Sequence, residues 1–173
     1  MLCVISVCII EAQAYGASDN RQTQYAYVKI NGVAVWQASW AGQYPAYRGV
    51  NVILVDRSTC TLQEWHNFDT HGRGPAGRLR DYLQGQSNGT VLVGVSCDEA
   101  SNDLDAAEAT LSALGANVSD VGWRGAWVLV AEIGNPSKTV LDMELTEEAA
   151  NARQPRVIAS FTGTVHYNFK GRK

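Results

Sequence analysis

Residues 24–39 read Gln-Tyr-Ala-Tyr-Val-Lys-Ile-Asn-Gly-Val-Ala-Val-Trp-Gln-Ala-Ser, and this stretch decides the fold class. Side chains alternate in character on both sides of Asn31-Gly32, a dipeptide that favours the tight turn of a β-hairpin. A second run, Gly49–Asp56, is apolar and rich in β-branched residues, as in a buried strand. The sequence therefore predicts a domain built mainly on β-sheet.

In the rest of the chain, the hydrophobic pattern predicts further strands and two helices. One helix is expected to begin at Pro75. The other is expected to be capped by Asn102 or Asp103 and to stop at Gly115. The remaining strands are predicted at Thr61–Phe68, Thr90–Ser96, Ala126–Ala131, Thr139–Leu145 and Arg156–Phe169. The fold class is therefore α/β and strand-dominated, in a single compact domain.

Composition excludes several classes of protein. The chain has 173 residues, of which 46% are hydrophobic, and a formal net charge of −3. One domain of this length can bury a sizeable core by itself. The slightly acidic balance argues against nucleic acid as a partner. No apolar run approaches the roughly 18 residues of a membrane span, so membrane insertion is not expected.

The N-terminal segment has the pattern of a secretory signal peptide. Leu2–Ile10 is apolar, and Ala12-Gln13-Ala14 fits an A-x-A cleavage site, although no Lys or Arg precedes the apolar run. We therefore expect residues 1–14 to be a signal peptide, residues 15–173 to form the domain, and the protein to be secreted. The alternative is a buried first strand.

A secreted protein can form disulfides and can be N-glycosylated. Cleavage would remove Cys3 and Cys8, so Cys60 and Cys97 become the candidates for one disulfide. Asn88-Gly89-Thr90 and Asn117-Val118-Ser119 fit the N-glycosylation acceptor, and both lie in stretches predicted as loops. We expect a glycoprotein.

Motifs for catalysis and metal binding were sought in the sequence and not found. The three histidines are scattered, and no zinc-type cluster, nucleophile elbow or phosphate-binding loop is present. We therefore expect no enzymatic activity, no metal and no cofactor.

Two arginines stand beside aromatic residues immediately before predicted strands, in Tyr47-Arg48-Gly49 and Trp123-Arg124-Gly125. Asp98 follows a third strand. Loop residues at strand ends are where binding sites concentrate. A neutral sugar needs guanidinium donors and a carboxylate acceptor for its hydroxyl groups, and an aromatic face against its C–H surface. The alternative is an Asp–Arg salt bridge that ties the loops together, with Trp123 and Trp127 in the core.

The same residues carry a family resemblance. The region from Arg48 to Ala131 resembles the interleukin-like EMT inducer (ILEI) domain, which occurs in the FAM3 family, in the stem of protein O-mannose N-acetylglucosaminyltransferase and in CEMIP/TMEM2 proteins. Five segments in order carry this resemblance: Arg48–Val55, Phe68–Thr70, Asp98–Ser101, Leu111–Gly115 and Val121–Trp127. Gly125 and Ala100 depart from the family's motifs.

The resemblance implies a pair of twisted, largely antiparallel sheets flanked by two or three short helices. It also implies a lectin-like site for a terminal N-acetylglucosamine-type sugar. Arg48, Asp98 and Arg124 would contact the polar groups, and Trp123 with Tyr47 would form the apolar wall. The expected partners are glycans or glycoproteins. The alternative, from the FAM3 branch, is a cytokine-like ligand of a cell-surface receptor, anchored by Trp40 and Tyr44.

Overall fold

Two antiparallel sheets form the domain in the computed structural model, which describes residues 2–16, 25–41, 44–45, 47–144 and 154–167. In the first sheet the strand order is β11 (Arg156–Tyr167), β1 (Leu2–Gln13), β3 (Tyr25–Ile30), β4 (Val33–Ala41) and β5 (Tyr44–Pro45). In the second it is β10 (Val140–Glu144), β9 (Ala126–Glu132), β8 (Val91–Asp98), β6 (Gly49–Asp56) and β7 (Thr61–Phe68). The short strand β2 (Tyr15–Gly16) runs parallel to the end of β8. The predicted strand-dominated α/β class is confirmed.

The predicted hairpin forms between β3 and β4. Asn31 and Gly32 lie in the turn with φ angles of 51° and 81°, the left-handed conformation that the dipeptide favours. Asn31 also contacts the neighbouring strand, because its Oδ1 accepts a hydrogen bond from the backbone N–H of Ile9 at 2.9 Å. The turn therefore fixes the register of the hairpin and its position beside β1.

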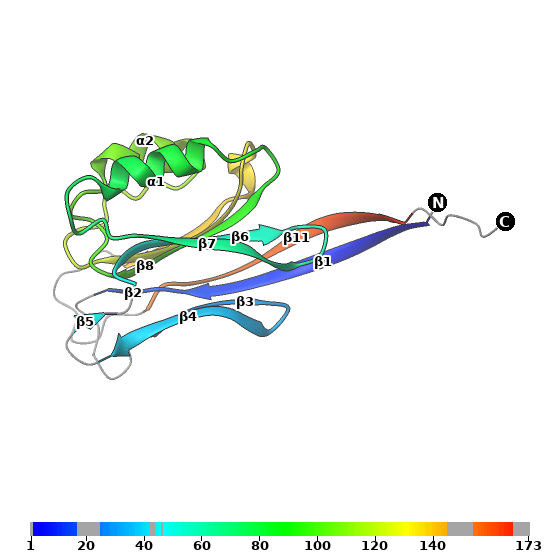
Figure 1. Cartoon of the computed structure of the whole chain (residues 1–173), viewed down its shortest axis with the longest axis horizontal. Coiled ribbons are helices and arrows are strands. Elements are labelled where there is room, and N and C mark those ends of the chain that lie inside the picture. Colours follow the sequence, from blue (N-terminus) through cyan, green and yellow to red (C-terminus); the bar gives the residue numbers. More distant parts are fainter. Residues whose placement is uncertain (1, 17–24, 42–43, 46, 145–153, 168–173) are drawn as a thin grey trace.

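The three central strands of the second sheet, β6, β8 and β9, are buried on both faces, whereas β7 is largely exposed. One face packs on the first sheet through side chains such as Ile53 and Val93. Two helices cover the other face, α1 (Pro75–Gln84) and α2 (Asp105–Ala113) (Figure 1). A single 3-10 turn, Pro136–Lys138, precedes β10. The apolar runs of β6, β8 and β9 follow from this position between two layers.

Helix α1 begins at Pro75 as predicted, but the predicted cap of α2 is wrong. The residue before α2 is Leu104, and no side chain caps the helix. Asp103 instead accepts a hydrogen bond from the backbone N–H of Gly74 at 2.7 Å, which joins the loops before the two helices. Gly115 ends α2 in the left-handed conformation, at a φ angle of 87°.

Within the segment predicted as a signal peptide, Leu2–Gln13 forms strand β1 in this structure, and cleavage of the segment stays a prediction. β1 lies between β11 and β3 in the first sheet. Ile10, Ala12 and Ala14 are fully buried. Within the apolar run, Cys8 and Ile10 are buried, whereas Val7 and Ile9 on the other face of the strand are exposed.

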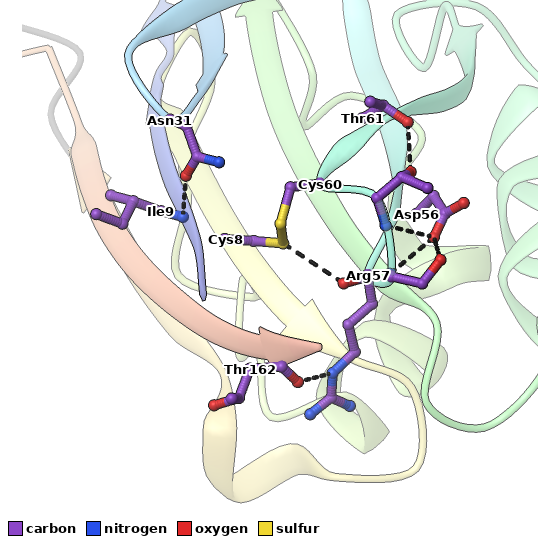
Figure 2. Close-up of a disulfide and its surroundings, with 10 residues drawn as sticks. Cys8, Ile9, Asn31, Asp56, Arg57, Cys60, Thr61 and Thr162 are labelled. Carbon is purple, nitrogen blue, oxygen red and sulfur yellow. Dashed lines mark hydrogen bonds between the residues drawn. A yellow bond between two sulfur atoms is a disulfide. The ribbon is translucent and has the colours of Figure 1, made fainter. Parts of the chain in front are cut away.

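A disulfide between Cys8 and Cys60 joins the two sheets, and the proposed Cys60–Cys97 pair is wrong (Figure 2). Cys60 lies in the turn between β6 and β7, whereas Cys97 pairs with Gly49 at the opposite end of β6. The length of β6, about 25 Å at 3.3 Å per residue, separates the two positions, and a disulfide requires Cα atoms within roughly 7 Å. Cys97 is a buried free thiol.

Strands β1 and β11 extend beyond the rest of the first sheet as a two-stranded ribbon. They pair along their whole lengths, from Leu2 with Tyr167 to Gln13 with Arg156. Strand β3 accompanies β1 only from Ile10 to Gln13. Figure 1 shows the ribbon projecting from the body of the domain, with the start of β1 and the end of β11 paired at its tip.

Candidate functional site

Charged residues from four separate segments meet at one edge of the second sheet. At this edge β6 and β9 begin and β7 and β8 end, because neighbouring strands are antiparallel. Arg48 directly precedes β6, Asp69 directly follows β7, Asp98 ends β8, and Arg124 stands two residues before β9. The three polar residues singled out from the sequence are therefore placed at the same edge, with Asp69 beside them.

Arg48 and Asp69 form a two-point ion pair. The Nε and Nη2 of Arg48 donate to the two carboxylate oxygens of Asp69 at 2.9 and 2.8 Å. Both side chains are partly exposed, at 34% and 46% of their surface. The hydrogen bonds from Arg48 lower the pKa of Asp69. The alternative to a binding site was an Asp–Arg salt bridge that ties the loops together. Such a salt bridge is present, but its acidic residue is Asp69 rather than Asp98.

Asp98 is a half-buried carboxylate with charged residues of both signs near it. Burial raises its pKa and the neighbouring Glu99 adds to that effect, whereas Arg48, Arg124 and His71 act in the other direction. Within the described part of the chain, no hydrogen bond reaches the Asp98 carboxylate. Its oxygens therefore retain their capacity to accept from a bound hydroxyl or amide group.

Trp123 and Arg124 form the side of the site next to the helices. The Trp123 ring is 42% exposed, and the Arg124 guanidinium carbon lies 5.9 Å from the ring centre. The ring of His71 lies 5.7 Å from the Trp123 ring. Trp127, in contrast, is fully buried and belongs to the core. Of the two tryptophans in this segment, only Trp123 presents a face to solvent.

Glu99 connects the loops that carry Asp98 and Arg124. The side chain of this buried residue accepts from the backbone N–H and hydroxyl of Ser101 at 2.7 and 2.6 Å, and from the backbone N–H of Arg124 at 2.5 Å. The buried Thr70 hydroxyl donates to the carbonyl of Ala100 at 2.9 Å and ties in the loop after β7. These bonds hold the site in place before any ligand binds.

The backbone at this edge adopts sparsely populated conformations. Five non-glycine residues in the described ranges have positive φ, and three of them are here: Tyr47 at 59°, Asp98 at 62° and Arg124 at 63°. Such conformations cost about 1–3 kcal/mol each and persist where the surroundings enforce them, often at functional sites. All three residues had been selected from the sequence as ligand-binding candidates.

Tyr47 and Trp123 have different aromatic neighbours. Its ring contacts Trp65 of β7 at 5.0 Å and Trp36 of β4 at 6.2 Å between ring centres. Within the described residues no ring contact joins Tyr47 to Trp123, whose neighbour is His71, so the expected apolar wall of these two residues stays a prediction. The side chains of Trp40 and Tyr44, predicted as receptor anchors, lie outside the described residues.

Sequence reasoning did not assign Asp69, His71 or Glu99 to the site. Asp69 could have been found by the rule that selected Asp98, because it also follows a predicted strand. Glu99 adjoins Asp98, but its role depends on hydrogen bonds from Ser101 and Arg124 that no local pattern indicates. His71 had no signal of its own, since its position depends on the packing of the loop between β7 and α1.

The other candidate positions are distributed around the domain. Asn88 and Asn117 are exposed and lie in loops, where an attached glycan has room. Among the described residues no cluster of three or more metal-ligating side chains occurs. The two α-helices of the described ranges have ten and nine residues, too few for either to cross a bilayer.

Comparison with known proteins places these residues in a family. The sequence model of the interleukin-like EMT inducer (ILEI) family matches residues 48–135, just over half of the chain. The matched region begins at Arg48 and includes β6 to β9. It therefore contains Arg48, Asp69, Asp98 and Arg124, which we call the charged cluster.

Individual relatives are much larger proteins. The chain is 31% identical over 110 residues to the mouse cell migration-inducing and hyaluronan-binding protein, a match that covers 62% of this chain and 8% of that protein. It is 32% identical over 94 residues to the human cell surface hyaluronidase CEMIP2, covering 52% of this chain and 7% of the relative. The cell surface hyaluronidase of Danio rerio is 32% identical over 91 residues, covering 50% and 7%. The chain thus spans less than a tenth of these relatives, and on the strength of the family match it belongs to the ILEI family.

Proposed function

We propose that this chain is a non-catalytic carbohydrate-binding domain that acts outside the cell and recognises an N-acetylglucosamine-type sugar. The observation that carries the proposal is the half-buried Asp98 carboxylate, which accepts no hydrogen bond within the described residues and is flanked by two arginines. Two of the relatives are named as cell-surface proteins, which supports the extracellular setting.

Each group in the site has a distinct part in the proposed recognition. Asp98 accepts hydrogen bonds from sugar hydroxyls, and Arg124 donates to hydroxyl or N-acetyl oxygens. Arg48 is held in position by Asp69 and can share its remaining donors with the ligand. Trp123 offers its exposed face to the C–H surface of the pyranose ring. Affinity for a single sugar should be weak, because few atoms are buried.

A glycan array followed by calorimetric titration tests the proposal. The array should include glycans ending in N-acetylglucosamine, and also hyaluronan fragments because one relative is named as hyaluronan-binding. We expect binding by the wild type and its loss in Arg124→Ala and Asp98→Asn. Arg80→Ala is the matched control, since this arginine lies on α1 and pairs with its neighbour Asp81. Equal behaviour of Arg124→Ala and Arg80→Ala on every glycan would refute the proposal.

The second candidate function is a cytokine-like ligand of a cell-surface receptor, and membership of the ILEI family supports it. Binding to cultured cells separates the two candidates. Binding that survives enzymatic removal of cell-surface glycans would favour the receptor ligand, whereas binding that disappears with the glycans would favour the carbohydrate-binding domain.

A further inference from the structure

A second exposed aromatic surface lies beside the charged cluster. Tyr47 and Trp65 are 43% and 37% exposed, and their rings meet edge to face at 5.0 Å. Trp36 lies beneath them, buried, with its ring centre 6.5 Å from that of Trp65. We call Tyr47 and Trp65 the aromatic platform.

The platform is built into the fold. The buried amide of Asn51 donates to the carbonyl of Tyr47 at 2.8 Å. The amide of Asn67 donates to the carbonyl of Arg48 and to Asn51 Oδ1, both at 3.0 Å. These bonds hold Tyr47 at a φ angle of 59°, a conformation that is uncommon for a bulky residue. The backbone that carries the exposed ring is thus held by an internal network, and the ring itself packs against those of Trp65 and Trp36.

The platform and Trp123 lie toward different layers of the domain. Trp36 belongs to the core between the two sheets, and Trp65 is paired with Ile53, which belongs to the same core. Trp123 instead contacts His71, in the loop that leads to α1. Arg48 directly follows Tyr47 in the chain and acts electrostatically on Asp98. The charged cluster therefore lies between two aromatic surfaces. The platform lies toward the first sheet, and Trp123 lies toward the helices.

From this arrangement we infer that the platform is a second carbohydrate subsite, so that the protein recognises an oligosaccharide rather than a single terminal sugar. One pyranose ring packs on Trp123 beside Asp98 and Arg124, and a further ring of the same glycan packs on Tyr47 and Trp65. Recognition of carbohydrate at the charged cluster is the proposed function on which this inference rests. The inference adds that the recognised ligand is longer than one sugar ring.

Titration with N-acetylglucosamine and with its β-linked tetramer, chitotetraose, tests the inference. The platform variants are Tyr47→Asn, which suits a left-handed backbone, and Trp65→Thr, which suits a strand. We expect the wild type to bind the tetramer at least tenfold more tightly than the monosaccharide. We expect each platform variant to bind the tetramer roughly tenfold more weakly, as the loss of ~1.4 kcal/mol would give, and to bind the monosaccharide like the wild type.

Controls separate loss of the subsite from loss of the fold and from failure of the proposed function. Tyr47→Phe keeps the ring and should bind both sugars like the wild type, and each variant should keep its thermal unfolding midpoint within a few degrees. Trp123→Ala should weaken the binding of both sugars. The inference is overturned, with the proposed function intact, if the wild type binds both sugars equally or if Tyr47→Asn leaves tetramer binding unchanged. If the wild type binds neither sugar nor any arrayed glycan, both fail.

Discussion

Gly16 lies directly against the carbonyl oxygen of Arg124, so close that a Cβ atom at position 16 would be 2.3 Å from that oxygen. Gly16 belongs to β2, which pairs with the end of β8 opposite Asp98. The chain that leaves the first sheet thus packs on the backbone of the loop that carries Arg124. This contact links the N-terminal strands to the site without involving any ligand-binding group.

Gly16→Ala should therefore disturb the site from a distance. The added methyl group must push the Arg124 loop away, and such overpacking costs about 1–3 kcal/mol of unfolding free energy. Urea unfolding should show this loss, and glycan titration should show weaker binding. Gly77→Ala is the matched control, since position 77 lies in α1 with nothing near its Cβ and should be neutral or slightly stabilised. An unfolding curve for Gly16→Ala identical to the wild type would contradict the contact.

Reduction of the Cys8–Cys60 disulfide should destabilise the domain. The bond closes a loop with a sequence separation of 52 and joins the two sheets. Its loss should lower the unfolding free energy by about 2–4 kcal/mol. Urea unfolding with and without reductant measures the effect, and Cys8→Ser should behave like the reduced wild type. Disulfide mapping by mass spectrometry that found Cys97 in a bond would disprove the assignment.

Asp98→Asn should stabilise the protein at neutral pH. The folded-state pKa of Asp98 is raised above its ordinary value of 3.8, so the charged form destabilises the folded state. This penalty is complete above the raised pKa, shrinks as the pH falls through it, and is absent below 3.8. The gap between the unfolding midpoints of the variant and the wild type should therefore be largest near pH 7 and close toward pH 3. A difference in unfolding midpoint that grows in acid would show that the pKa of Asp98 is lowered in the folded state.

Asp69→Asn should show the reverse dependence. The pKa of Asp69 is lowered by its hydrogen bonds from Arg48, so the charged form stabilises the folded state. This stability is present above the unfolded value of 3.8 and is lost as the pH falls through the lowered folded pKa. The variant should be less stable than the wild type at pH 7, by less than about 1 kcal/mol because the pair is partly exposed. The two should converge in acid.

Asn88 and Asn117 should each carry a glycan when the protein is made in a secretory pathway. Both are exposed loop residues in acceptor sequences. Intact-mass measurement of the wild type, Asn88→Gln, Asn117→Gln and the double variant checks each position separately. A wild-type mass equal to that of the double variant would show that neither position is used.

Local sequence was enough to predict the elements whose conformation depends on local chemistry. Asn31-Gly32 favours its turn in any context, and Gly49–Asp56 has the composition of a buried strand. The positions of Arg48, Asp98 and Arg124 at strand ends also follow from the strand boundaries. Asp69 is at such an end too, but its pairing with Arg48 depends on the antiparallel register of β6 and β7.

The remaining features depend on contacts between residues far apart in the chain. An apolar run such as Leu2–Ile10 has the same composition in a signal peptide and in a strand, and its pairing with β11 depends on Arg156–Tyr167, far away in the chain. The partner of Cys60 follows from how the two sheets pack. The backbone at Tyr47 and Arg48 is held by hydrogen bonds from Asn51 and Asn67, which no local pattern could identify.

The ribbon of β1 and β11 has a practical consequence for experiments on this protein. Leu2 and Tyr167 are paired at its tip, at the far end of the molecule from β2 and the end of β8 (Figure 1). A biotin attached to a cysteine introduced at Leu2 or Tyr167 would therefore anchor the protein to a sensor chip through the tip of the ribbon, away from the sheet edge that carries Asp98. Weak sugar binding could then be measured on immobilised protein without blocking the face that is being tested.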